Sequence, residues 1–139
     1  MLLKSCGTTA SHPISTTELS VFWENKGVIT AVGQLDAIYR HRDTSELCIV
    51  DFKRTNKNLS PDAHSFGKFG RVTSPMKGKP ASEFYKYSLQ TSIYACCISQ
   101  RLGEEVSVSV LLKLFGDTEY EVVECMDLRD EARLILDSL

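Results

Sequence analysis

Residues 33–54 read GQLDAIYRHRDTSELCIVDFKR. Two apolar stretches flank a polar segment at residues 42–45 that supplies turn residues, so this part of the chain predicts two antiparallel strands joined by a turn. The second stretch, ELCIVDFKR, is a nearly continuous apolar run, which is typical of a strand covered on both faces. If the turn is centred between Asp43 and Thr44, Asp36 lies directly opposite Asp51.

The two aspartates are the candidate metal ligands. Residues facing each other across neighbouring strands have Cβ atoms about 5 Å apart, so two carboxylates placed there repel each other unless a cation lies between them. Mg²⁺ and Mn²⁺ prefer all-oxygen ligands of this kind. We therefore expect a metal site at Asp36 and Asp51, to which the peptide carbonyl of Phe52 could contribute a further ligand.

Lys53 lies two residues after Asp51, so a strand would project both side chains from one face. An ammonium beside a metal can orient a water molecule or neutralise charge on phosphoryl oxygens. The alternative is a plain ion pair on a solvated strand face, which the surrounding apolar residues make less favourable.

The rest of the chain predicts an α/β domain with the order β-β-β-loop-α-β-β-α. A first strand is expected at residues 17–24. A long loop at 54–82 holds three prolines, and Ser82 can cap a helix that runs to Gly103. Two strands, EVSVSVLLKLF and TEYEVVECM, follow, and Asp127 could cap a last short helix.

Composition sets broad limits on function. At 139 residues the chain is expected to form one domain, and no apolar run approaches the roughly 20 residues of a membrane span. The formal charge of −2 means that any contact with nucleic acid must come from local clusters of Lys and Arg. Five cysteines without a C-x-x-C pair are expected to be reduced, which favours an intracellular protein; nucleus, mitochondrion and viral replication site are not distinguished.

Taken together, G-x-L-D at residues 33–36 and V-D-F-K at residues 50–53 resemble the signature of the PD-(D/E)XK nuclease superfamily. Gln90 and Tyr94 on the predicted helix resemble the Q-x-x-x-Y element of its RecB-type exonuclease branch, and four residues apart they share one helical face. The resemblance covers roughly residues 17–125. For Tyr94 alone, an ordinary half-buried helix position is an equal alternative.

The resemblance implies a restriction-endonuclease-like core, a mixed sheet of about four to five strands flanked by helices. It also implies a Mg²⁺-dependent or Mn²⁺-dependent deoxyribonuclease of exonuclease type. Asp36, Asp51 and Lys53 would be catalytic, Gln90 would orient substrate or a ligand, and Tyr94 would contact the nucleic-acid backbone. Glu18 matches an acidic residue that the family often uses as an additional metal ligand, although an exposed strand glutamate is an equal alternative.

The 54–82 loop is the candidate DNA-binding segment. Its basic side chains could follow a phosphate backbone, and nearby aromatic rings could stack on unpaired bases, which would favour single-stranded DNA or duplex ends. Phe84, by contrast, is expected in the core. The candidate contacts are Arg54, Lys57, Lys68, Arg71, Lys77, Lys79 and Tyr85.

Residues 1–16 depart from the family pattern, because they are expected to form an extension to a domain at 17–139 instead of the usual N-terminal core helix. That helix is short or missing, and a partner chain or another segment could supply it. One alternative function is therefore a non-catalytic subunit that keeps the nuclease fold to bind nucleic acid or to assemble a larger complex. Another is an endonuclease of a viral or mobile-element replication module.

Overall fold

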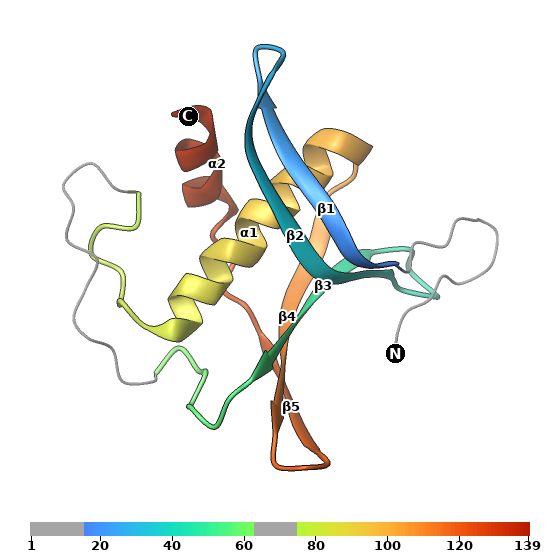
Figure 1. The fold of residues 1–139 in the computed structure, drawn as a ribbon, viewed down its shortest axis with the longest axis vertical. Coiled ribbons are helices and arrows are strands. Elements are labelled where there is room, and N and C mark those ends of the chain that lie inside the picture. The colour runs from blue at the N-terminus through green and yellow to red at the C-terminus, as the bar shows by residue number, and fades with distance from the viewer. Residues whose placement is uncertain (1–15, 63–74) are drawn as a thin grey trace.

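The computed structural model describes residues 16–62 and 75–139, which form five strands and two helices (Figure 1). The predicted order of elements is confirmed. The elements are β1 (Thr16–Asn25), β2 (Val28–Arg40), β3 (Leu47–Arg54), α1 (Glu83–Leu102), β4 (Val106–Phe115), β5 (Glu119–Glu124) and α2 (Arg129–Asp137).

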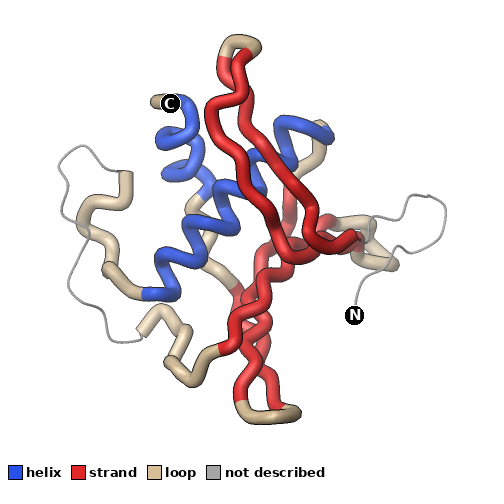
Figure 2. Tube along the Cα trace, in the orientation of Figure 1, coloured by secondary structure: helices blue, strands red, loops and turns tan. Residues whose placement is uncertain are grey.

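The strands form one mixed sheet with the order β1-β2-β3-β4-β5. β3 and β4 pair in parallel, and the other neighbouring pairs are antiparallel. A parallel pair needs a long crossover connection, and α1 supplies it here. Figure 2 shows that the strands form a twisted sheet with the helices packed beside it. The structure is thus an α/β domain with a mixed sheet flanked by helices, as the sequence predicts.

The turn between β2 and β3 has the predicted register. Arg40 pairs with Leu47 and Ala37 with Val50, and the turn closes through a hydrogen bond of 2.8 Å from His41 N to Glu46 O. The paired ladder ends at Ala37 and Val50, one position before the two aspartates. The same register continued by one residue brings Asp36 opposite Asp51.

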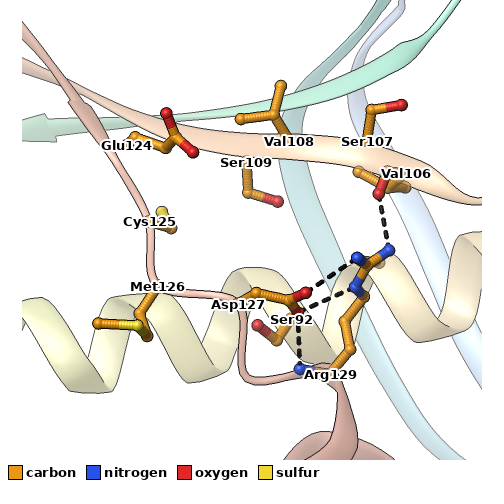
Figure 3. Close-up of a pocket in the computed structure, with 11 residues that line it drawn as sticks. Ser92, Val106, Ser107, Val108, Ser109, Glu124, Cys125, Met126, Asp127 and Arg129 are labelled. Atoms are coloured by element: carbon orange, nitrogen blue, oxygen red, sulfur yellow. Dashed lines mark hydrogen bonds and ion pairs between the residues drawn. The ribbon is translucent and has the colours of Figure 1, made fainter.

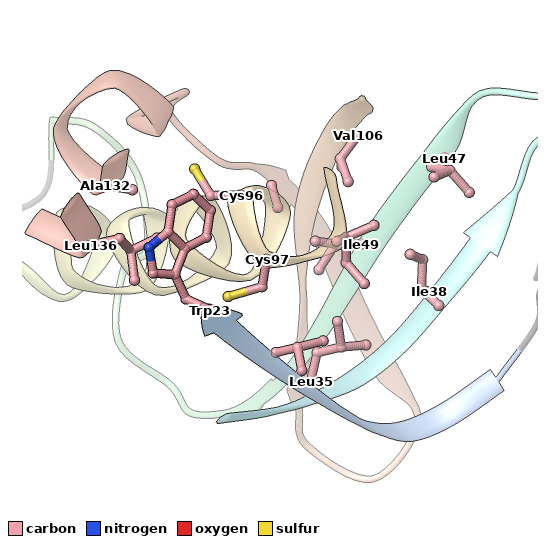
Figure 4. Close-up of a cluster of buried hydrophobic side chains, with 13 residues drawn as sticks. Trp23, Leu35, Ile38, Leu47, Ile49, Cys96, Cys97, Val106, Ala132 and Leu136 are labelled. Atoms are coloured by element: carbon pink, nitrogen blue, oxygen red, sulfur yellow. The ribbon is translucent and has the colours of Figure 1, made fainter. Parts of the chain in front are cut away.

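The hydrophobic core lies between the sheet and the helices. Leu35, Ile49 and Val106 contribute from the strands, and Cys96 and Cys97 contribute from α1. In Figure 4, the Trp23 indole of β1 lies between these two cysteines and the α2 residues Ala132 and Leu136. Trp23 therefore joins both helices to the first strand.

α1 begins and ends as its sequence predicts. Ser82 Oγ accepts a hydrogen bond of 3.3 Å from Tyr85 N, and Gly103 ends the helix with a left-handed φ of 72°. Phe84 in the first turn is buried, which confirms its expected place in the core.

α2 begins differently from the prediction. Asp127 does not cap it, because the helix starts only at Arg129, with Leu128 in the N-cap position and no side-chain cap. Asp127 Oδ1 instead accepts a hydrogen bond of 3.1 Å from the Arg129 amide and pairs with the Arg129 guanidinium at 2.9 Å. The guanidinium also donates to Val106 O at 2.7 Å, so Arg129 links α2 to the start of β4 (Figure 3).

Serine hydroxyl groups of α1 hold the segment between β5 and α2. Met126 N donates to Ser88 Oγ and Leu128 N donates to Ser92 Oγ, each at 3.0 Å. Both serines are buried. Ser92 lies on the side of α1 that faces this segment, next to Asp127 in Figure 3. Ser92 thereby satisfies the amide of buried Leu128, which would otherwise lack a partner.

The prediction that β3 is covered on both faces is wrong for the described part of the chain. Side chains alternate along a strand, so Leu47, Ile49 and Asp51 face α1 while Val50 and Phe52 face the other way. Phe52 is 40% exposed, and no described helix residue lines the apolar groove on that side. On that side Cys48 and Val50 line the apolar groove together with Val108 and Val110 of β4.

Candidate functional site

Two carboxylates meet where β2 and β3 diverge. Asp36 lies in β2 and Asp51 in β3, each just past the last paired residues of the ladder. Asp36 Oδ2 accepts a hydrogen bond of 2.8 Å from the Phe52 amide, so the side chain crosses to the neighbouring strand. This contact fixes the Asp36 carboxylate beside Asp51.

Asp51 is a buried acid with an unsatisfied oxygen. The residue is only 5% exposed, and its Oδ2 atom receives no hydrogen bond. Burial raises the pKa of Asp51, and the Asp36 carboxylate raises it further, while Lys53 acts in the opposite direction. A buried carboxylate beside a second acid gains from nearby positive charge.

Lys53 provides part of the compensating charge. Its Nζ atom lies 2.9 Å from Asp51 Oδ2 and forms an ion pair with it. The two side chains project from the same face of β3, as the spacing of two residues predicts. The side chain of Lys53 is 21% exposed, so the ammonium can be reached from solvent while it remains next to the acid.

The backbone of Phe52 faces the same site. Its amide donates to Asp36, and the N–H and C=O of one strand residue point to the same strand edge. The carbonyl of Phe52 is thus directed toward the β2 side, where the ladder has ended and β2 no longer uses it. The donor set at this position consists of two carboxylates and a peptide oxygen, which suits a hard divalent cation such as Mg²⁺ or Mn²⁺.

Glu18 is the third acidic residue of the predicted site, and the pairs Thr17–Ala37 and Leu19–Leu35 on either side place it level with Asp36. Among residues 16–62 and 75–139, no group of three His, Cys, Asp or Glu side chains is placed to hold a metal. Glu18 lies in β1, next to the strand of Asp36, but it is exposed and has a left-handed φ of 54°. Its assignment as a third acidic ligand stays a prediction.

Gln90 and Tyr94 lie on the face of α1 that meets β2. Gln90 Nε2 donates to Tyr94 Oη at 3.3 Å, so the two share one face as predicted. The Tyr94 ring lies against Gly33 so closely that a Cβ atom on Gly33 would be 2.7 Å from Tyr94 Cε1. The glycine of the G-x-L-D motif and the tyrosine of the Q-x-x-x-Y motif are therefore in direct contact.

Tyr87 is a site residue that the sequence analysis missed. Its ring lies under Lys53, with 4.0 Å between Nζ and the ring centroid, and its hydroxyl group donates to Glu83 Oε1 at 2.9 Å. Tyr87 precedes Gln90 by three residues and so lies on a neighbouring part of the same helix surface. The three-residue spacing from Gln90 is the sequence feature that could have indicated Tyr87 as a site residue.

The structure describes only some of the proposed DNA contacts. Lys57 and Lys77 are exposed, and Lys79 pairs with Glu131 of α2 at 3.0 Å. Arg54 donates to Gly116 O at 3.2 Å. Tyr85 is half-buried, and its ring meets Phe84 edge-on at 5.4 Å. Lys68 and Arg71 lie outside the described residues.

The described cysteines are not activated nucleophiles. Burial raises the pKa of Cys48, Cys97 and Cys125 to about 11, so these three groups remain thiols near neutral pH. Cys48, Cys96, Cys97 and Cys125 are all free. Neither described helix has the length and apolar character that a membrane crossing requires.

Comparison with known proteins identifies a related fold. No protein-family model matches the sequence, and no curated protein sequence matches it. A crystal structure of a "Putative exonuclease" from Eubacterium rectale is similar over 88% of this chain, with a TM-score of 0.55 and 15% sequence identity. The chain spans 41% of the length of that structure. At this identity the similarity establishes the fold, which is consistent with a restriction-endonuclease-like core.

Proposed function

We propose that this protein is a metal-dependent nuclease of the PD-(D/E)XK type, related to the RecB-like exonuclease branch, that hydrolyses phosphodiester bonds in DNA. The observation that carries the proposal is the buried Asp51 carboxylate. It has a second acid beside it at Asp36, which raises its pKa, and the Lys53 ammonium lies 2.9 Å from its Oδ2 atom. The fold shared with an exonuclease-like structure supports the same class.

The residues divide the chemistry as follows. Asp36, Asp51 and the carbonyl of Phe52 would hold Mg²⁺ or Mn²⁺, which polarises the scissile phosphate and lowers the pKa of water. Asp51 would bind from a fixed position because this part of β3 is paired with β4, where Asp51 lies opposite Leu111. Lys53 orients the attacking water and stabilises the negative charge that grows on the phosphoryl oxygens. Gln90 orients substrate or a metal ligand, and Tyr94 contacts the nucleic-acid backbone.

Exposed basic residues on the segments that connect to β3 and α1 favour a polyanionic substrate. Lys57 follows β3, and Lys77 precedes α1, so both lie on segments that leave or enter the elements of the site. Such side chains would contact phosphates without reading sequence. We expect binding to weaken steeply with salt for this reason.

The decisive experiment is cleavage of end-labelled DNA with Mg²⁺ or Mn²⁺. Wild type should cleave, and Asp36→Asn, Asp51→Asn and Lys53→Met should each lose about 100-fold or more of the rate. Matched controls are Asp117→Asn and Lys26→Met, which change an exposed acid and an exposed lysine in the β4–β5 and β1–β2 turns. Both controls should cleave like wild type. Equal rates in wild type and all three site variants would refute the assignment.

The same assay separates the alternatives. An exonuclease degrades linear DNA and leaves circular DNA intact, whereas an endonuclease of a replication module also opens the circle. DNA binding without cleavage in either metal would favour the non-catalytic subunit. Calorimetric titration with Mn²⁺ adds an independent measurement, because a competent site binds the ion in wild type and loses that binding in Asp51→Asn.

A further inference from the structure

The surroundings of Lys53 contain a group outside the predicted motif. The ammonium lies between Asp51 Oδ2, at 2.9 Å, and the face of the Tyr87 ring, at 4.0 Å from the centroid. Contacts within about 6 Å of an aromatic face attract a cation through the ring quadrupole, and more strongly when water is partly excluded. The ion pair and the ring contact together define where this ammonium lies.

The Tyr87 ring is itself anchored. Its hydroxyl group donates to Glu83 Oε1 at 2.9 Å, one helical turn earlier on α1. Burial raises the pKa of Tyr87 and the Glu83 carboxylate raises it further, so the phenol keeps its proton and continues to donate. The ring is half-buried, and rotation away from Lys53 would break this hydrogen bond.

We propose that Tyr87 is a positioning residue that holds the Lys53 ammonium at the two aspartates. The inference rests on the proposed nuclease function, because it assigns Tyr87 a part in that reaction through Lys53. A lysine side chain loses much rotamer freedom when it is fixed in one place. The ring face of Tyr87 offsets part of that loss before substrate arrives, while the ring itself need not touch the substrate.

This role differs from simple core packing in what it predicts. A packing residue tolerates a large aliphatic replacement and affects stability more than rate. A positioning residue requires an aromatic face, so phenylalanine should replace tyrosine whereas leucine should not. The Tyr87→Phe and Tyr87→Leu variants therefore separate the two roles.

The first test measures kcat and KM for DNA cleavage. Tyr87→Leu should lose about tenfold in kcat with little change in KM, which corresponds to about 1.4 kcal/mol. Tyr87→Phe should stay within about threefold of wild type. Glu83→Ala, which removes the same hydrogen bond as Tyr87→Phe but keeps the ring, should likewise stay within about threefold of wild type. A Tyr87→Leu enzyme that cleaves at the wild-type rate, while Lys53→Met is inactive, overturns the positioning role and leaves the nuclease function intact.

The second test does not depend on activity. In protein with ¹³C-labelled lysine, the ε-methylene signal of Lys53 is identified by its loss in Lys53→Met. The ring of Tyr87 should shift this signal upfield in wild type and in Tyr87→Phe, and the shift should disappear in Tyr87→Leu. If wild type fails to cleave DNA but shows the shift, the nuclease function fails and the hold on Lys53 stands. An unshifted signal in wild type overturns the inference.

Discussion

Gly33→Ala tests the contact between the two sequence motifs. The added methyl carbon would lie 2.7 Å from Tyr94 Cε1, and ordinary contacts begin at 3.4 Å, so the ring must move by 3.4 − 2.7 = 0.7 Å. The ring packs against the core cluster and binds Gln90, so it cannot move without a cost. Overpacking of this kind costs about 1–3 kcal/mol. Alanine recovers less than about 1 kcal/mol from the lower backbone entropy of the unfolded chain.

The free energy of unfolding should therefore fall by about 1–2 kcal/mol in Gly33→Ala, as measured by urea denaturation at constant m-value. The control is a double-mutant cycle with Tyr94→Leu, which removes the ring atoms that the new methyl group would meet. In that background Gly33→Ala should be neutral or stabilising, so the coupling energy is at least about 1 kcal/mol. An equal cost in both backgrounds would show that the glycine is required for another reason.

Three further changes test other parts of the structure. Ser92→Ala should destabilise the protein by about 1–3 kcal/mol, because it leaves the buried Leu128 amide without its acceptor. Denaturant unfolding measures this cost. A cost below about 0.5 kcal/mol would contradict the importance of this hydrogen bond. Ser82→Ala should cost about 1 kcal/mol through loss of the α1 N-cap, and Ser82→Asp should restore most of it in the same measurement. The third change concerns pH. Burial raises the pKa of Asp51, so the folded state holds this proton more tightly than the unfolded state. The folded state therefore loses stability as the pH rises above the ordinary pKa of aspartate. The free energy of unfolding of Asp51→Asn relative to wild type, without divalent ions, should therefore increase from about pH 4 to pH 7, and a decrease would contradict the burial of this carboxylate.

Local patterns predicted the strand pair that carries the site. The turn at residues 42–45 fixes the register, and the register alone brings Asp36 opposite Asp51. Lys53 follows from the period of two along a strand. These residues could be assigned because the contacts between them are close in sequence and depend only on backbone geometry.

Contacts between α1 and the sheet could not be predicted in the same way. The spacing of Gln90 and Tyr94 gives a shared helical face, but not the rotation of the helix about its axis or its height along β3. That rotation decides that Tyr87 lies under Lys53 while Tyr85 meets Phe84. The open face of β3 escaped prediction for a related reason, because an apolar run in a central strand looks the same whether one face or both are covered.

The place of β3 within the sheet also bears on how the site responds to local opening. All of β3, Asp51 and Lys53 included, is in register with β4, and a hydrogen bond of 3.1 Å from Thr55 N to Leu114 O continues the pairing just past the end of the strand. We expect amide hydrogens in such a central strand to be among the slowest in the domain to exchange with solvent. The acid that would bind the metal thus sits on one of the slowest-exchanging segments, so fluctuations at the sheet edges leave its geometry unchanged.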